Sequence, residues 1–150
     1  MFKGKFLIVS LLIFLLTGCG GEKVSTDEDY FNQTNEIISE LKPAVAVLMG
    51  AIEIYTDDHS RYAEMGEPGQ KAYDIFTKEY EALTNITAVA GWESRHNELT
   101  DDVKYFQDFA REVVRTSKSG DPIDLGSPAS NFPSRYTSVN SLTELYQAKK

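Results

Sequence analysis

Apolar side chains recur at alternating steps of three and four residues through most of the chain after residue 27. This spacing keeps side chains on one face of a helix, so it restricts the fold more than any other feature of the sequence. We expect a first helix from Asp27 to the GEPG segment at residues 66–69, with Ser25 and Glu28 at capping-box spacing. Its apolar face comprises Phe31, Thr34, Ile38, Leu41, Val45, Leu48, Ile52, Tyr55, His59 and Tyr62.

Pro43 lies inside this first pattern, and two structures are compatible with it. One is a break into two antiparallel helices, and the other is a kink in a single long helix. A reversal usually takes about two to five loop residues. Only Lys42 is available here, and the apolar spacing continues across the proline. We therefore expect one long helix that is kinked at Pro43.

Two further apolar faces follow the first. They predict a helix at about residues 70–90, a turn at Gly91, and a helix from residue 92 to near Lys118. The faces are Tyr73, Phe76, Tyr80, Leu83, Thr87 and Ala90, then Trp92, His96, Leu99, Val103, Phe106, Ala110 and Val113. Helices of similar length joined by short turns pack antiparallel. The expected fold is therefore all-α, an antiparallel three-helix bundle.

Residues 119–138 differ in composition from the segments before them. They are rich in Ser, Gly and Pro and show no helical period, which predicts an extended or disordered strap. Ser141 and Glu144 have capping-box spacing, so a short C-terminal helix is expected after the strap. The strap is long enough to bring this helix back onto the first one. The residues that it would cover are Phe31, Ile38 and Leu41.

The first 19 residues have the composition of an export signal. Lys3 and Lys5 precede an apolar core at residues 6–16, which is too short to be a good permanent membrane anchor. The segment Leu16-Thr17-Gly18-Cys19 that follows resembles the lipobox of bacterial lipoprotein precursors. The alternative is an ordinary secretory signal with a chance cysteine near its end.

The resemblance implies a lipid anchor. A diacylglyceryl group would be attached to the Cys19 sulfur, and signal cleavage would fall between Gly18 and Cys19. The protein would then be held by its lipid at the extracytoplasmic face of a bacterial cell membrane. The expected organisation is a signal peptide at 1–18, a lipidated tether at 19–26, a helical bundle at 27–118, and a strap with a short helix at 119–150.

Composition limits the partners and the chemistry. The net charge is −8, and every acidic residue lies at Glu22 or later. Because nucleic-acid affinity comes largely from Lys and Arg, an acidic body makes nucleic acid an unsuitable partner. Lipidation would use the single cysteine, so disulfides, thiolate metal sites and cysteine nucleophiles are not expected in the mature domain.

Catalytic, metal and cofactor sites are not predicted. His59 and His96 both lie on apolar faces, but the bundle topology places them about 16 Å apart along its axis, so we expect half-buried structural histidines and not shared metal ligands. Asp57 and Asp58, and likewise Asp101 and Asp102, are neighbours on a helix and do not converge on one ion. We expect these aspartates to belong to a solvated face.

Tyr105 and Phe109 are the candidate partner-facing aromatic residues. They lie to one side of the third apolar face and would form an exposed patch suited to another protein. The alternative, which we favour, is that the strap or the first helix covers them.

Three functions remain compatible with the sequence. The first is a non-enzymatic envelope module that binds a neighbouring protein or a wall component. The second is a ligand-binding protein with a tyrosine-lined pocket, which unpaired tyrosine hydroxyls would favour. The third is a hydrolase whose carboxylates converge only in three dimensions.

Overall fold

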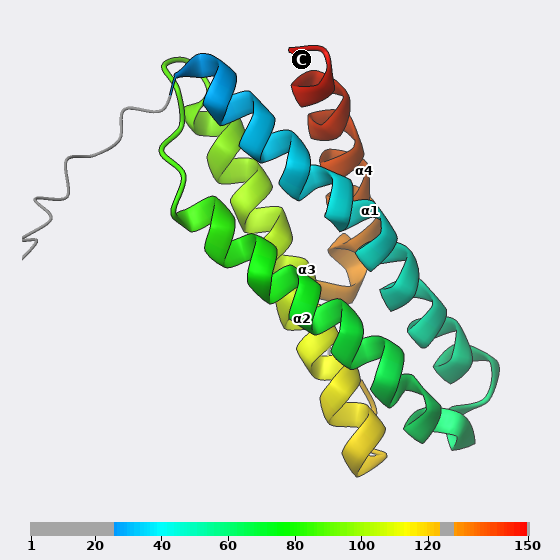
Figure 1. Ribbon diagram of the computed structural model, residues 1–150. Coiled ribbons are helices and arrows are strands. Elements are labelled where there is room, and N and C mark those ends of the chain that lie inside the picture. Colours follow the sequence, from blue (N-terminus) through cyan, green and yellow to red (C-terminus); the bar gives the residue numbers. More distant parts are fainter. Residues whose placement is uncertain (1–25, 124–127, 150) are drawn as a thin grey trace, which may run out of the picture.

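The computed structural model describes residues 26–123 and 128–149 of the chain. In these ranges the chain forms helices and no β-strand: α1 (Asp27–Asp57), the 3₁₀-helix η1 (His59–Met65), α2 (Gly66–Thr84), α3 (Glu93–Ser119) and α4 (Pro128–Gln147). The predicted all-α bundle is therefore confirmed (Figure 1).

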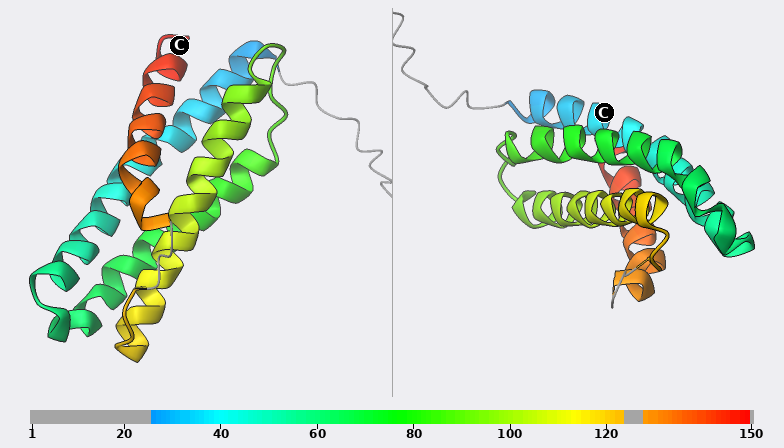
Figure 2. Two further views of the ribbon diagram at one scale, coloured as in Figure 1. Left: turned by 180° about the vertical axis from the view of Figure 1, so that it is seen from behind. Right: turned by 90° about the horizontal axis from the view of Figure 1, so that it is seen from below.

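The bundle is organised around α2. This helix packs against both α1 and α3, which make few contacts with each other. α4 contacts α1 and α3 but, among the described residues, not α2. It therefore lies between α1 and α3 on the side away from α2, as the two views in Figure 2 show. α1 and α3 run in one direction along the bundle, and α2 and α4 run in the other (Figure 1).

The start of α1 is capped by a side chain. The Thr26 hydroxyl accepts a hydrogen bond from the Asp29 amide at 3.1 Å, which satisfies one of the unpaired N–H groups of the first turn. The cap expected from the Ser25 and Glu28 spacing is therefore wrong by one residue. Ser25 itself lies outside the described residues.

α1 is continuous through Pro43, as predicted, and the alternative of two antiparallel helices is wrong. Its end differs from the expectation. The helix stops at Asp57, and Asp58 follows with an extended backbone before η1 begins. The Asp58 carboxylate accepts a hydrogen bond from the Ser60 amide at 2.9 Å, so it caps η1.

The GEPG segment begins a helix and does not end one. α2 starts at Gly66, and Pro68 lies in its first turn, where the missing N–H of proline removes no helical hydrogen bond. Proline is equally common shortly after a helix, so the sequence pattern alone does not distinguish the two positions. α2 ends at Thr84, before the predicted residue 90, and the predicted turn residue Gly91 has φ +82°.

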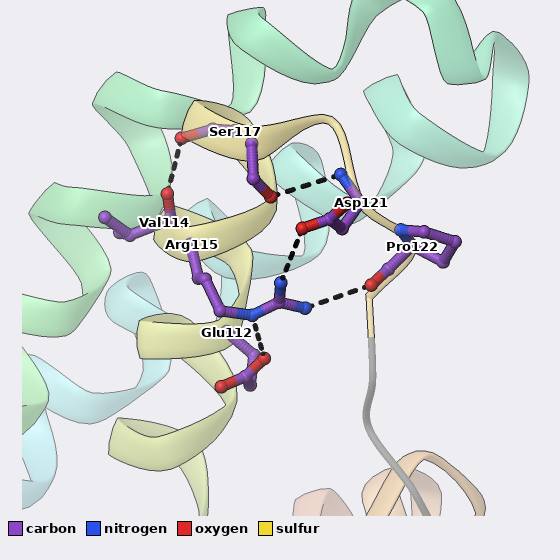
Figure 3. A network of polar contacts seen from close by, with 7 residues as sticks. Glu112, Val114, Arg115, Ser117, Asp121 and Pro122 are labelled. Atoms are coloured by element: carbon purple, nitrogen blue, oxygen red, sulfur yellow. Dashed lines mark hydrogen bonds and ion pairs between the residues drawn. The ribbon is translucent and has the colours of Figure 1, made fainter.

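α3 has nearly the predicted bounds and is followed by Gly120, whose φ is +71°. A polar network then holds the chain against the helix (Figure 3). Arg115 donates hydrogen bonds to Glu112 at 2.7 Å and to the Pro122 carbonyl at 3.0 Å, and it lies 3.5 Å from the Asp121 carboxylate. The network therefore holds Asp121 and Pro122 beside the last turns of α3.

α4 overturns the prediction of a strap. Residues 128–138, which were expected to be extended or disordered, belong to this 20-residue helix, and Ser141 lies well inside it. Pro128 is the first residue of the helix, a position where proline is well tolerated. Pro133 lies inside the helix, where proline cannot donate the usual backbone hydrogen bond to the residue four positions earlier. The expected return of the C-terminal segment to the first helix is confirmed at Phe31, whose ring lies 6.2 Å from that of Tyr146.

The predicted apolar faces of α1 and α3 form most of the core. Leu41, Leu48, Leu99 and Val103 are each at most 1% exposed. Gly69 allows α2 to approach α3 closely, because a Cβ at this position would lie 2.8 Å from a Val113 methyl group. Within the described ranges, no helix has both the length and the apolar character that crossing a membrane requires.

Candidate functional site, a groove between α1 and α2

Two carboxylates are buried in the described part of the chain: Glu79 on α2, and Asp102 on α3. Acidic side chains are rarely fully buried unless they are paired, so each position requires a physical account. The surroundings of the two residues differ. Glu79 borders a hollow on the surface, whereas Asp102 lies beneath α4.

Glu79 lines a groove of about 390 Å³ between α1 and α2. We call it the α1/α2 groove. It is lined by Gln33, Glu36, Ile37 and Glu40 from α1, by Lys78, Glu79 and Ala82 from α2, and by Asn85 and Ile86 just beyond α2. The lining thus combines three carboxylates and one amine with an apolar surface.

The position of Glu79 follows from the period of α2. The other buried residues of this helix are Gly69, Ala72, Phe76 and Leu83. Glu79 continues the same spacing between Phe76 and Leu83, so its backbone position faces the interior. A purely structural helix would place an apolar side chain there, because burial of a charge has a large desolvation cost.

Lys78 is the ion-pair partner of Glu79. Its Nζ lies 2.8 Å from Oε1 of Glu79, but the lysine side chain is 74% exposed while that of Glu79 is only 3% exposed. The hydrogen bond to Glu79 and the charges of Glu79, Glu40 and Glu36 raise the pKa of Lys78. One ammonium group therefore lies among three carboxylates, and the groove has an excess of negative charge.

Asp102 has a different partner and a different environment. Its side chain is fully buried, and Oδ1 accepts a hydrogen bond from Arg135 of α4 at 2.6 Å. Burial raises the pKa of Asp102, although the nearby Ser138 hydroxyl and the Arg135 guanidinium act in the opposite direction. The Ser138 hydroxyl donates its hydrogen to Glu98 at 3.0 Å. These contacts attach α4 to α3.

A second polar cluster attaches the end of α4. The Tyr146 and Tyr30 hydroxyls are 2.8 Å apart, Tyr30 lies 3.3 Å from Nδ1 of His96, and Asn35 donates to the Tyr146 carbonyl at 3.2 Å. Nε2 of His96 lies 3.2 Å from the Leu83 carbonyl, which can only accept, so we assign the hydrogen to Nε2. Burial lowers the pKa of His96 and raises the pKa of both tyrosines.

The two histidines lie in separate surroundings. His59 packs edge-on against Tyr55, with ring centroids 4.5 Å apart, whereas His96 belongs to the cluster around Tyr30. In the ranges that the structure describes, no three His, Cys, Asp or Glu side chains are grouped as a metal site requires.

Three of the four singled-out aspartates have the expected exposure, and one does not. Asp57, Asp58 and Asp101 are exposed. The prediction is wrong for Asp102, because α4 covers the face of α3 that was expected to be solvated.

Tyr105 and Phe109 do not form an exposed patch. Phe109 is 5% exposed, and its ring lies 5.2 Å from that of Phe132 on α4. Tyr105 is half-buried, with the Arg135 guanidinium 5.8 Å from its ring centroid. The expected exposed patch is therefore not found. The favoured alternative, that the strap or the first helix covers these residues, is confirmed for the strap residues Phe132 and Arg135, although they belong to α4.

Sequence reasoning did not identify Glu79 and Lys78 as residues of interest, and it placed Asp102 on a solvated face. The available signal for Glu79 was its place four residues before Leu83 and three after Phe76, at the core spacing of α2. The predicted lipid-attachment and cleavage residues, Cys19 and Gly18, lie outside the described residues. Comparisons of the chain with protein-family models, curated proteins and solved structures found no match.

Proposed function

We propose that this chain is a lipid-anchored protein of the bacterial envelope that presents a small acidic helical domain outside the cytoplasmic membrane. Its role is that of a non-enzymatic module that binds another envelope protein or a wall component. The observation that carries the proposal is the segment Leu16-Thr17-Gly18-Cys19 directly after an apolar core of export-signal length.

The proposed anchor is close to the bundle. Cys19 is separated from Asp27, the first residue of α1, by a segment that can span no more than about 30 Å when extended. A thioether-linked diacylglyceryl group supplies two acyl chains, which is enough for stable anchoring. The α1/α2 groove begins at Gln33, in the half of α1 nearest the anchor, so it would act close to the membrane.

The two other functions have different support. A tyrosine-lined ligand pocket would be favoured by unpaired hydroxyls, but Tyr30 and Tyr146 bond to each other at 2.8 Å. A carboxylate-based hydrolase keeps one favourable observation, because Glu36, Glu40 and Glu79 line the same groove. We keep the hydrolase as the second candidate. Hydrolysis of an envelope substrate by the unaltered chain, lost in the Glu79→Gln variant, would establish it.

The test of anchoring is the substitution Cys19→Ala. We expect an uncleaved, unlipidated precursor, because the modification requires the thiol. Intact-protein mass spectrometry of the membrane fraction measures the outcome, and the unaltered chain serves as the reference. A mature, lipid-modified mass in the variant would contradict the proposal.

The test of the module is in-cell crosslinking followed by mass spectrometry. One dominant protein partner that disappears in the Cys19→Ala form would support an anchored interaction module. The same partner captured equally by both forms would contradict the role of the anchor.

A further inference from the structure

We propose that the α1/α2 groove docks a basic segment of a partner protein, with the charged head of one Lys or Arg placed at Glu79. The alkyl stem of that residue would lie along Ile37, Ala82 and Ile86. This inference rests on the proposed function, because it names the chemistry of the partner that the anchored module binds.

Charge complementarity is the first argument for this occupant. Glu36, Glu40 and Glu79 line the groove together with one cationic side chain, Lys78. The whole chain is also acidic, with a net charge of −8. Fields of one sign in a surface hollow raise the local concentration of the opposite charge and repel the same charge. A cationic partner is therefore favoured over a phosphate or a carboxylate.

The burial of Glu79 is the second argument. Its side chain is 3% exposed and lines the groove, yet its ion-pair partner is its own neighbour in sequence. Adjacent residues of a helix point about 100° apart, so Lys78 reaches Glu79 from the solvent side. The pair joins no two elements of the fold, and it contributes little to holding α1 against α2. A buried charge at a core position is thus retained without an evident structural need.

Lys78 marks the position where a partner's cation would bind. Its ammonium is attracted by Glu79, Glu40 and Glu36, while its side chain is 74% exposed. Ion pairs with an exposed member are weak, so displacement of Lys78 by a partner would cost little. Removal of this internal cation should therefore strengthen the binding of an external one.

The apolar part of the lining is the third argument. Ile37 is 6% exposed, and Ala82 and Ile86 are half-buried. Lys and Arg place their methylene stems along apolar surface while the charged head makes polar contacts. A groove that combines this surface with a buried carboxylate fits both parts of such a side chain.

The experiment measures peptide binding by fluorescence anisotropy. The full processed chain, in a neutral detergent, is titrated with a fluorescein-labelled nonapeptide that contains three lysines. The same peptide with norleucine in place of lysine is the neutral control. The variants are Glu79→Gln and Lys78→Met, with Glu81→Gln as the matched control, because Glu81 is an exposed glutamate of α2 that does not line the groove.

We expect Glu79→Gln to weaken binding of the lysine peptide by about tenfold or more, and Glu81→Gln to change it by less than about twofold. Lys78→Met should strengthen it several-fold, and the norleucine peptide should not bind. Circular dichroism of each variant confirms that it is folded. Charge removal at Glu79 keeps the shape of the side chain, so Glu79→Gln should retain the helical spectrum.

Three outcomes would overturn the proposal. Equal losses of affinity for the lysine peptide in Glu79→Gln and Glu81→Gln would show that the peptide is attracted only by the net charge of the chain. Weaker binding by Lys78→Met would show that Lys78 is not a competitor. Displacement by spermidine as effective as that by unlabelled peptide would assign the groove to free polyamines. If any of these occurs while crosslinking still finds an anchor-dependent partner, the proposed function stands and only the docking site is wrong.

Discussion

Glu79 and Asp102 are both buried carboxylates on neighbouring helices. Their ion-pair partners differ in sequence separation. Glu79 pairs with Lys78, the residue before it, at 2.8 Å. Asp102 pairs with Arg135, which is 33 residues away on α4, at 2.6 Å. The first pair can form in an isolated helix, whereas the second forms only when α4 is docked on α3.

This difference separates a structural carboxylate from a candidate binding carboxylate. The ion pair between Asp102 and Arg135 attaches α4 to α3. This tertiary contact offsets the desolvation cost of burying the Asp102 carboxylate. The Glu79 pair leaves the carboxylate facing a groove whose other charges are mostly of the same sign. Buried charge without a tertiary role is the feature that directs attention to the α1/α2 groove.

The largest expected effect is at the Asp102 pair. Arg135→Met should lower the free energy of unfolding by about 2 to 3 kcal/mol, because it leaves the buried carboxylate without its partner. Asp102→Asn should cost much less, because the remaining arginine is 39% exposed and can be hydrated. Urea denaturation of the chain from residue 24 onward measures both. Equal losses of unfolding free energy in the two variants would contradict the expectation that an unpaired Asp102 costs more than an unpaired Arg135.

A gain of stability is expected at Glu79. Glu79→Leu should raise the free energy of unfolding by about 1 kcal/mol, because an apolar side chain at this core position removes the desolvation cost. The same variant should lose the binding of the lysine peptide. Glu81→Leu on the exposed face is the control and should change stability by less than about 0.5 kcal/mol. A destabilised Glu79→Leu would instead indicate that the pair with Lys78 is structural.

The smallest effect is in the pH dependence of stability. The pKa of Asp102 is raised above its ordinary value of 3.8. In the pH interval between 3.8 and the raised pKa, Asp102 keeps its proton in the folded chain and has lost it in the unfolded chain. Stability from this group therefore falls as the pH rises through that interval. The pKa of His96 is lowered from 6.5, so its contribution rises as the pH increases up to 6.5. Asp102→Asn should remove the fall of stability with rising pH, and His96→Gln should remove the rise. Thermal unfolding between pH 4 and about 8 measures both effects. A pH dependence that neither variant changes would contradict these assignments.

The helices that the sequence predicts well are those with apolar residues at nearly every inward position. In α3, His96, Leu99, Val103 and Val113 occupy the expected face, and the helix has almost the predicted bounds. α1 is continuous through Pro43 for the same reason, because packing along its whole length compensates the lost hydrogen bond.

α4 shows why this reasoning fails where the inward face is mixed. The spacing of Phe132, Arg135, Val139, Leu142 and Tyr146 is helical, but one of the five is charged. The surrounding Ser and Pro residues also resemble a loop. Arg135 can lie on the inward face only because Asp102 is there to receive it. That partner lies in another helix, so no local pattern reveals it.

By itself, the sequence determined the helical class, the continuity of the first helix and the turn at Gly91, because the regular spacing of apolar side chains and the preference of glycine for a positive φ are visible in the sequence without knowledge of the tertiary contacts. Tertiary structure alone decided that α4 is a full helix between α1 and α3, that it covers Phe109, and that Asp102 and Glu79 are buried. Each of these depends on side chains that are distant in sequence and come together only when the helices pack.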